Sequence, residues 1–275
     1  MKNNIYQTTQ SEAFSPPNYI QLVNEKQMDQ IQRIKTFASS SYAGLNIADT
    51  LEFFTRRYVR QIFEFATIDR NTTIADIGAG FGWLSMAFAF STDAKIIAID
   101  VDAERIMAGK AIAEILGLQG KIEWRSGMPG SLPLKEREVD IAYCIEVLEH
   151  TKKDTRFVQE LCRISKMFII LTTPNLWFPV IAHDTGLPFC HWLPVSLRKT
   201  YAHLLKRDQM ENDNIFWSPS ELLKRMEGFK PVSRWLHYKS LQHFKETYPF
   251  YLPYGNGKYV KKPGFTKILY YKIAS

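Results

Sequence analysis

The sequence predicts an α/β fold: a doubly wound, mostly parallel sheet of seven strands, with helices ahead of the first strand and a lid inserted after the fifth. Three observations lead to this prediction. Short apolar segments typical of strands alternate with helix-like segments between residues 72 and 175. The first of these strands runs directly into a glycine-rich turn. The chain has 275 residues, 45% of them hydrophobic, which is enough for one good core.

Residues 1–70 form the first expected segment, which is helical. Apolar residues recur at helical spacing in Ile20–Thr36 and in Leu51–Phe65, so we expect a helix in each range. The polar, proline-bearing stretch Ser11–Pro17 precedes them.

The segment Thr72–Trp83, TTIADIGAGFGW, is the most informative in the chain. An apolar strand ends in Asp76, and three glycines spaced two apart follow it: Gly78, Gly80 and Gly82. Glycine lets the backbone turn tightly and approach a ligand closely, since it carries no side chain. We therefore expect a ligand to lie against this turn.

The glycine spacing separates two cofactors. A dinucleotide fingerprint needs its third glycine where Trp83 stands, which argues against NAD. The chain instead has D-x-G-x-G-x-G, which resembles motif I of the class I S-adenosylmethionine (SAM) dependent methyltransferases; a tight turn in another α/β protein is the alternative. The resemblance implies a Rossmann-like fold and SAM as cofactor. It assigns the residues of the turn to the cofactor site: Asp76, Gly78, Ala79, Gly80 and Gly82.

The second expected strand, Lys95–Val101, carries an acid near its end, Asp100. In a doubly wound sheet this position lies beside the glycine turn, where a carboxylate can accept both hydroxyls of a ribose. Asp102 is a less favoured ribose ligand, because it also fits the N-cap of a helix over 103–116. Val101 resembles the apolar residue on which the family stacks the adenine.

A third expected strand, Gly120–Arg125, leads into SGMPGSLPL. Many family members carry Gly-Asp-Ala-x-x-Leu-Pro here, and their Asp binds the adenine amino group. Alignment on the Leu-Pro pair places Gly127 at the glycine and Met128 at the Asp. The side-chain contact is therefore missing, and Met128 offers only its backbone and packing.

The fourth expected strand, Val139–Ile145, continues into EVLEHT. This string resembles the segment after strand four in the type 11 and the ubiquinone-biosynthesis type O-methyltransferases. The resemblance places Glu146 beside the methionine half of SAM and the transferred methyl group, as a cofactor-binding and catalytic candidate. Alternatively, Glu146 is a helix N-terminal acid stabilised by the macrodipole. His150 is expected to pack on the sheet or on the next helix.

A helix over Lys153–Arg163 and a fifth strand over Lys166–Thr172 complete the region that resembles the family, about 100 residues. We assign residues 71–175 to a SAM-binding core. The resemblance fades before and after these residues.

Residues 176–217 are predicted to form a lid, because about 40 residues follow strand five where a short connection would suffice. If the acceptor is a hydroxyl, His183 and His191 are candidate bases, with Asp184 as orienter. Structural histidines bonded to the backbone are the alternative. The substrate-binding candidates are Asn175, Asp184, Trp192 and Arg198. Asn175 can equally terminate the strand.

One helix of the lid shows a basic amphipathic pattern. Its apolar positions share one face: Leu197, Tyr201, Leu204 and Leu205. Its basic positions are Arg198, Lys199, Lys206 and Arg207. The pattern suits contact with a membrane surface, and it suits a lid helix packed on the core equally well.

Residues 218–275 are expected to complete the sheet with strands over Val232–Leu241 and Thr266–Ile273. From Gly228 onward there are nine Lys or Arg and one acid, whereas the rest of the chain has 26 basic and 27 acidic residues. This local positive charge suits an anionic partner. Edge-strand lysines that discourage aggregation are the alternative.

Several classes of protein are disfavoured. No apolar run approaches the roughly 20 residues of a membrane span, and MKNNIYQTTQ does not resemble a secretory signal. The three cysteines fit a reducing cytosol and argue against a zinc site, so we expect no metal. The Asn/Asp-Pro-Pro-aromatic tetrapeptide of base-amine methyltransferases is absent after strand four, which weakens nucleic-acid methylation.

The sequence therefore predicts a SAM-dependent methyltransferase that acts, most plausibly at oxygen, on a small-molecule, glycan or lipid-linked acceptor. We expect it in the cytoplasm, with contact to the inner face of the membrane as an option. The alternatives are a non-catalytic methyltransferase-like ligand-binding or regulatory protein, and an RNA methyltransferase.

Overall fold

The computed structural model describes residues 14–63, 65–177, 181, 185–207, 214–231, 253–254, 258–259 and 265–272. The chain divides into two compact units, Met1–Ser126 and Gly127–Ser275. The segment boundaries expected at residues 70, 175 and 217 stay predictions.

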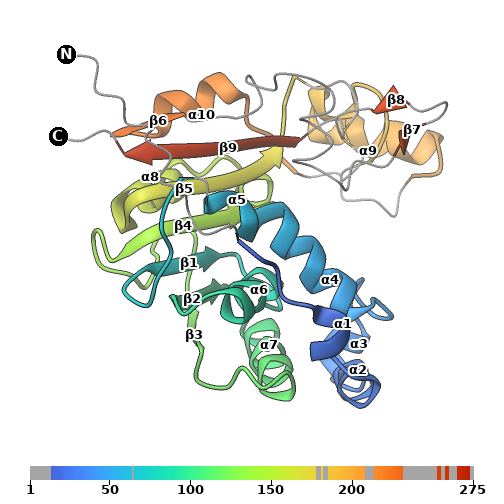
Figure 1. The fold of residues 1–275 in the computed structure, drawn as a ribbon. Helices are drawn as coiled ribbons and strands as arrows, with labels where there is room; N and C mark the ends of the chain where they lie inside the picture. Colours follow the sequence, from blue (N-terminus) through green and yellow to red (C-terminus); the bar gives the residue numbers. More distant parts are fainter. Residues whose placement is uncertain are drawn as a thin grey trace. The chain divides into compact units, whose positions relative to one another are not determined.

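The first unit contains three parallel strands in the order β3-β2-β1, preceded and linked by helices (Figure 1). Its described elements are α1 (Tyr19–Leu22), α2 (Glu25–Gln32), α3 (Lys35–Ala38), α4 (Ile47–Phe54), the π-helical turn η1 (Thr55–Val59), α5 (Arg60–Ile62), β1 (Thr73–Ile77), α6 (Trp83–Ser91), β2 (Lys95–Asp100), α7 (Ala103–Ile115) and β3 (Ile122–Ser126). Asp76 pairs in register with Ala98 and Asp100 with Ser126, so both acids lie at the carboxyl edge of the strands.

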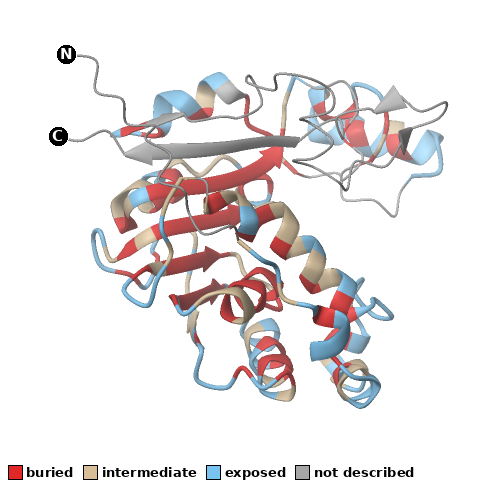
Figure 2. Ribbon diagram, in the orientation of Figure 1, coloured by how far each residue is buried: buried red, intermediate tan, exposed pale blue. Residues whose placement is uncertain are grey.

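Strand β2 shows why this sheet lies inside the unit. Its residues Ile96–Ile99 are all buried, on both faces, as expected for parallel strands covered by helices (Figure 2). Helices α6 and α7 both contact β2 and β3, and the N-terminal helices pack on the outer sides of α6 and α7. The strands predicted over 72–76, 95–101 and 120–125 are confirmed to within about two residues.

The single helix predicted over Ile20–Thr36 is wrong. The backbone is extended at Val23, and the Asn24 side chain begins a new helix by accepting from the Gln27 backbone while Gln27 caps in return. A second break follows at Ile34, which is also extended. Three short helices replace the expected one.

The helix predicted over Leu51–Phe65 is confirmed in type but begins and ends earlier. Asn46 accepts a hydrogen bond from the Asp49 backbone and starts α4 at Ile47. The helix passes through the π-helical turn η1 and ends at Ile62.

The second unit contains two parallel strands, β4 and β5, followed on the β5 side by antiparallel β9 and then β6. Its described elements are β4 (Val139–Ile145), the 3₁₀ turn η2 (Leu148–Thr151), α8 (Thr155–Ile164), β5 (Ser165–Pro174), the 3₁₀ turn η3 (Cys190–Trp192), α9 (Val195–Leu204), α10 (Pro219–Arg225), β6 (Phe229–Pro231), β7 (Pro253–Tyr254), β8 (Lys258–Tyr259) and β9 (Phe265–Lys272).

The strand expected over Thr266–Ile273 is confirmed as β9, whereas the strand expected over Val232–Leu241 lies outside the described residues. Strand β4 has the bounds that the sequence predicted. Helix α8 begins where the Asp154 side chain accepts from the Arg156 backbone, and it packs on β4 and β5. Among the residues that the model describes, no helix is long and apolar enough to cross a bilayer.

Candidate functional site

The turn between β1 and α6 folds back over the end of β2. The backbone N–H groups of Gly78 and Ala79 both donate to the Ile99 carbonyl, at 2.8 and 3.0 Å. All three glycines of the turn have positive φ: 77° at Gly78, 56° at Gly80 and 77° at Gly82. This left-handed backbone is costly for residues with a side chain, so the glycines are needed for the shape of the turn.

The glycines differ in what lies beside them. A Cβ added at Gly80 would meet nothing within 4 Å, so this position leaves room for a ligand. A Cβ at Gly82 would lie 2.4 Å from Cη2 of Trp124 on β3. Gly82 therefore makes room for the Trp124 ring, whereas its approach to a ligand stays a prediction.

Helix α7 accommodates the same indole. A Cβ at Gly109 would lie 2.8 Å from Trp124 and 2.7 Å from the Phe81 carbonyl oxygen. Trp124 thus fills the space between the turn, β3 and α7, a structural role that sequence analysis missed. Two residues, Gly82 and Trp124, are 42 positions apart, and no local pattern links them.

Asp100 is held in a fixed orientation by backbone amides. Its Oδ2 accepts from the Gly80 N–H at 2.7 Å, and its Oδ1 accepts from the Asp102 N–H at 2.9 Å. The carboxylate is 9% exposed. Each oxygen still has a lone pair after these bonds, so the group can accept further hydrogen bonds from a diol.

Asp102 has a different task. Its Oδ1 accepts from the backbone N–H groups of Glu104 and Arg105, which makes it the N-cap of α7 as predicted. Val101, between the two acids, is 53% exposed. An apolar side chain open to solvent at this edge is available for stacking.

Asp76 is the second acid at the carboxyl edge of these strands. It is buried, and its Oδ2 accepts from both the backbone N–H and the hydroxyl of Ser85 on α6. Burial raises the pKa of the Asp76 carboxyl to about 6; the two bonds from Ser85 oppose the shift, and the charge of Asp100 adds to it.

In the second unit, the predicted adenine-side residues lie in an open turn. Ser131 donates its backbone N–H to the Met128 carbonyl at 3.0 Å, and the Met128 side chain is 65% exposed. Gly127 precedes it and is half-buried. The Met128 side chain thus faces solvent.

Glu146 follows β4 directly. It has a positive φ of 57°, and its N–H donates to the Thr172 carbonyl of β5 at 2.9 Å. The turn η2 begins only at Leu148, so the alternative that Glu146 occupies a helix first turn is wrong. A non-glycine residue in this strained backbone region is a feature typical of functional sites.

In the segment EVLEHT, the burial of Glu149 and His150 differs from the prediction. His150 is exposed, so the expectation that it packs is wrong. Glu149 is fully buried instead, and its Oε2 accepts from the Thr173 hydroxyl at 3.1 Å. Sequence analysis missed Glu149, because adjacent acids in a short turn give no periodicity that would separate the inner one from the outer one.

Asn175 follows β5 directly and terminates the strand, which is the alternative to a role in substrate binding. Its Oδ1 accepts from the Trp177 N–H at 3.0 Å, and its backbone pairs with Trp217. The Leu176 carbonyl accepts two hydrogen bonds, one from Nε2 of His191 at 3.0 Å and one from Nε1 of Trp192 at 2.6 Å.

His191 therefore fits a structural histidine. It is 2% exposed, and because a carbonyl can only accept, its Nε2 carries the proton. Trp192 is 47% exposed above it. Two further lid candidates, His183 and Asp184, lie outside the described residues.

Arg198, a substrate-binding candidate and one of the basic positions of the amphipathic pattern, is buried. Its guanidinium donates to three carbonyls, those of Leu193, Asn214 and His191, each at 2.7 Å. These donors stabilise the chain's own backbone, so the role of Arg198 in binding an acceptor is not favoured.

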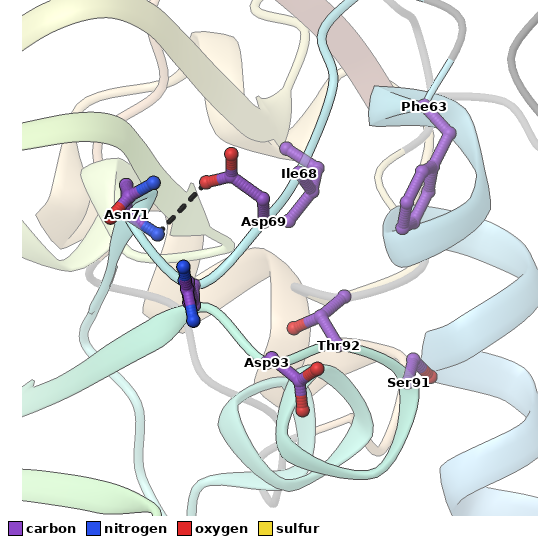
Figure 3. Close-up of a pocket in the computed structure, with 8 residues that line it drawn as sticks. Phe63, Ile68, Asp69, Asn71, Ser91, Thr92 and Asp93 are labelled. Atoms are coloured by element: carbon purple, nitrogen blue, oxygen red, sulfur yellow. Dashed lines mark hydrogen bonds between the residues drawn. The ribbon is translucent and has the colours of Figure 1, made fainter.

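A separate depression of about 530 Å³ lies at the opposite edge of the first unit, where β1 and β2 begin (Figure 3). Its polar lining includes Asp69, which accepts from the Asn71 N–H at 2.8 Å. This depression is remote from Asp76 and Asp100. Among the described residues, no cluster of three or more His, Cys, Asp or Glu side chains could hold a metal ion.

Comparisons with known proteins agree on one family. Residues 75–167 match the family model Methyltransf_11, described as a methyltransferase domain. The chain is 25% identical over 114 residues to norajmaline N-methyltransferase of Rauvolfia serpentina, covering 40% of this chain and 39% of the relative. It is 28% identical over 140 residues to the O-methyltransferase rstn1 of Aspergillus nomiae, covering 51% and 60%. The chain thus spans about two to three fifths of the length of these curated relatives.

Solved structures show the same fold. A structure from Galdieria sulphuraria, which its name assigns to the sarcosine dimethylglycine methyltransferases, gives a TM-score of 0.52 at 13% identity, over 82% of this chain and 85% of that one. A geranyl diphosphate methyltransferase in complex with SAM gives a TM-score of 0.50 at 14% identity, over 94% and 96%. The mostly parallel α/β arrangement of β1–β5 with flanking helices is the Rossmann-like fold of these proteins.

Proposed function

Because residues 75–167 form a class I SAM-dependent methyltransferase domain, we propose that this protein methylates a small-molecule, glycan or lipid-linked acceptor, at an oxygen atom. The cofactor is proposed to lie against the carboxyl ends of β1 and β2. The observation that supports this placement is the Asp100 carboxylate, which two backbone N–H groups orient at the end of β2.

The residues at these strand ends fit a nucleoside. The Asp100 carboxylate is already oriented by the N–H groups of Gly80 and Asp102, and each additional bond to a ribose hydroxyl is worth about 1.5–3 kcal/mol. Gly80 leaves open space above the turn, and Val101 offers an exposed apolar face for an adenine. The match to the family model covers both strand ends.

The cationic parts of the cofactor suit the acids at this edge. SAM supplies an activated methyl group on a sulfonium, so the protein has mainly to align the acceptor and exclude water. The carboxylates of Asp76 and Asp100 place two negative charges at this edge, where they can attract the cationic parts of SAM. Glu146 is proposed to border the methionine half, as the family resemblance implies, with Met128 contributing backbone and packing.

The acceptor side is proposed to include residues 176–217 as a lid. For a hydroxyl acceptor, His183 and His191 are the proposed candidate bases, with Asp184 as orienter, and Glu146 is a further catalytic candidate. The bond of His191 to the Leu176 carbonyl favours His183 of the two histidines. Trp192 offers a half-exposed indole for contact with the acceptor. The relatives include both an O- and an N-methyltransferase, so they do not decide between oxygen and nitrogen as the methyl acceptor. Methylation at oxygen therefore belongs to the proposal.

The test is a transfer assay with SAM labelled in its methyl group, incubated with fractionated cell extract and either wild-type protein or Asp100→Ala. We expect label in a small-molecule, glycan or lipid fraction with the wild type and a loss of at least tenfold with the variant at limiting SAM. Label in RNA would favour the RNA methyltransferase alternative. SAM binding without label in any fraction would favour a non-catalytic protein.

A further inference from the structure

Large apolar side chains are exposed in one short segment of the second unit. Within the described parts of 176–207, the side chain of Leu204 is 73% exposed and that of Trp177 is 65% exposed. We call the following set the apolar surface: Trp177, Phe189, Leu197, Leu204 and Leu205. Such a concentration of exposed apolar side chains is typical of an interaction site.

The orientation of α9 is the decisive observation. The helix buries Arg198 and Ala202, whereas Leu197 and Leu204, seven residues apart and therefore on one side of the helix, are exposed. If α9 were a lid helix packed through its leucines, these side chains would be buried. Of the four apolar positions expected on one face, the three leucines, Leu197, Leu204 and Leu205, are exposed, whereas Tyr201 packs against the core beneath the segment.

This orientation is built into the segment by strong local contacts. The three hydrogen bonds of Arg198 tie the start of α9 to the backbone on either side of it. Leu187, Cys190 and Ala202 form a small core beneath the segment, and Tyr201 packs against that core. The Trp192 indole is fixed by its bond to the Leu176 carbonyl and lies 5.0 Å, between ring centroids, from Phe189.

The charge of the segment indicates what covers it. Residues 185–207 contain no Asp or Glu, and three of their cations are exposed: Lys199, Lys206 and Arg207. Acids flank this range in the sequence, at Asp184 and at Asp208, Glu211 and Asp213, so the positive charge belongs to α9 and the residues directly after it. A second copy of this chain would bring the same cations face to face, which disfavours a symmetric dimer. An anionic surface complements them.

We propose that the apolar surface enters the interface of a lipid bilayer that contains anionic lipids. Exposed tryptophan and phenylalanine side chains are suited to the headgroup level, and leucines of an amphipathic helix to the acyl boundary just below it. Lys199, Lys206 and Arg207 then lie at the level of the lipid phosphates. Binding through ten helical residues and a few cations is reversible and weakens with salt.

The experiment is co-sedimentation of the full chain with vesicles of phosphatidylcholine alone and of phosphatidylcholine with phosphatidylserine. The test variants are Leu197→Ser with Leu204→Ser, and Lys199→Glu with Lys206→Glu. The matched controls are Ile20→Ser, which removes a side chain that is 76% exposed in the first unit, and Lys110→Glu on the exposed side of α7. Unchanged circular dichroism and an unchanged urea unfolding midpoint of each variant show that it is folded.

We expect the wild type to bind phosphatidylserine vesicles at least tenfold more strongly than neutral vesicles at low salt. Each double variant should lose at least tenfold, and both controls should retain binding. The proposal is overturned if the wild type does not bind anionic vesicles, or if the controls lose binding as much as the double variants do. It is also overturned if sedimentation velocity shows a dimer that the leucine double variant abolishes.

Discussion

At the residue scale, Asp100 and Asp102 stand two positions apart yet have separate tasks. Asp102 is committed to the N-terminus of α7 through two backbone amides. Asp100 is oriented by the Gly80 and Asp102 amides and keeps lone pairs for a ligand. The sequence predicted this division, because a cap residue and a strand-end acid have different positions relative to the helix that follows.

Asp76 predicts a pH dependence of stability. Its folded pKa of about 6 lies above the ordinary value of 3.8, so the folded protein binds more protons than the unfolded chain between these values. The contribution of this group is therefore fully present below pH 3.8 and is lost as pH rises through 6, a change of about 3 kcal/mol. Asp76→Asn keeps the shape and an acceptor for Ser85 and removes the ionisation.

Urea unfolding of both proteins at several pH values between about 4 and 7 checks this prediction. The free energy of unfolding of the wild type should fall relative to that of Asp76→Asn as pH rises, so that the variant gains most at pH 7. A difference between the two proteins that stays constant across this range would contradict the pKa assigned to Asp76.

At the element scale, capping residues decided how well helices were predicted. Asp102 fixed the start of α7, whereas Asn24 interrupted an apolar pattern that otherwise continued over Ile20–Thr36. Periodicity also grouped the apolar side chains of α9 but did not show which of them are buried, because the three carbonyls bound by Arg198 come from residues as far away as Asn214. Contacts of this kind are not local and leave no spacing in the sequence.

The packing of Trp124 on β3 against the glycine turn and α7 gives a second prediction. Gly82→Ala places a methyl group 2.4 Å from the Trp124 ring at a φ of 77°, and we expect a loss of stability of roughly 2–4 kcal/mol. Gly80→Ala has open space around it and carries only the cost of its positive φ, about 1–2 kcal/mol.

Chemical unfolding of the two variants measures this contrast, and the double variant Gly82→Ala with Trp124→Leu tests its cause. In the Trp124→Leu background, Gly82→Ala should cost less stability than it costs in the wild type, because the added methyl group no longer meets the indole. Equal losses for the two glycine variants, with no recovery in the double variant, would assign the glycine requirement to backbone conformation alone.

At the scale of the whole molecule, the sequence predicted the strands β1 to β3 and the glycine turn more fully than the segment 176–217. Buried apolar runs such as Ile96–Ile99 and the glycine turn have strong local patterns, and both were found. The roles of residues 176–217 depend on contacts such as those of His191 and Arg198 with distant carbonyls. For His191 the contact agrees with the structural alternative that the sequence left open, and Arg198, a substrate-binding candidate, has three backbone carbonyls as partners.

The central claim is that SAM binds at the carboxyl ends of β1 and β2 with its ribose on Asp100. Calorimetric titration of SAM into the wild type, Asp100→Ala and Asp102→Ala tests this claim most directly. We predict binding by the wild type, at least tenfold weaker binding by Asp100→Ala, a change of about 1.4 kcal/mol or more, and near wild-type affinity for Asp102→Ala. Equal affinity of the wild type and Asp100→Ala, or no binding of SAM by the wild type, would contradict it.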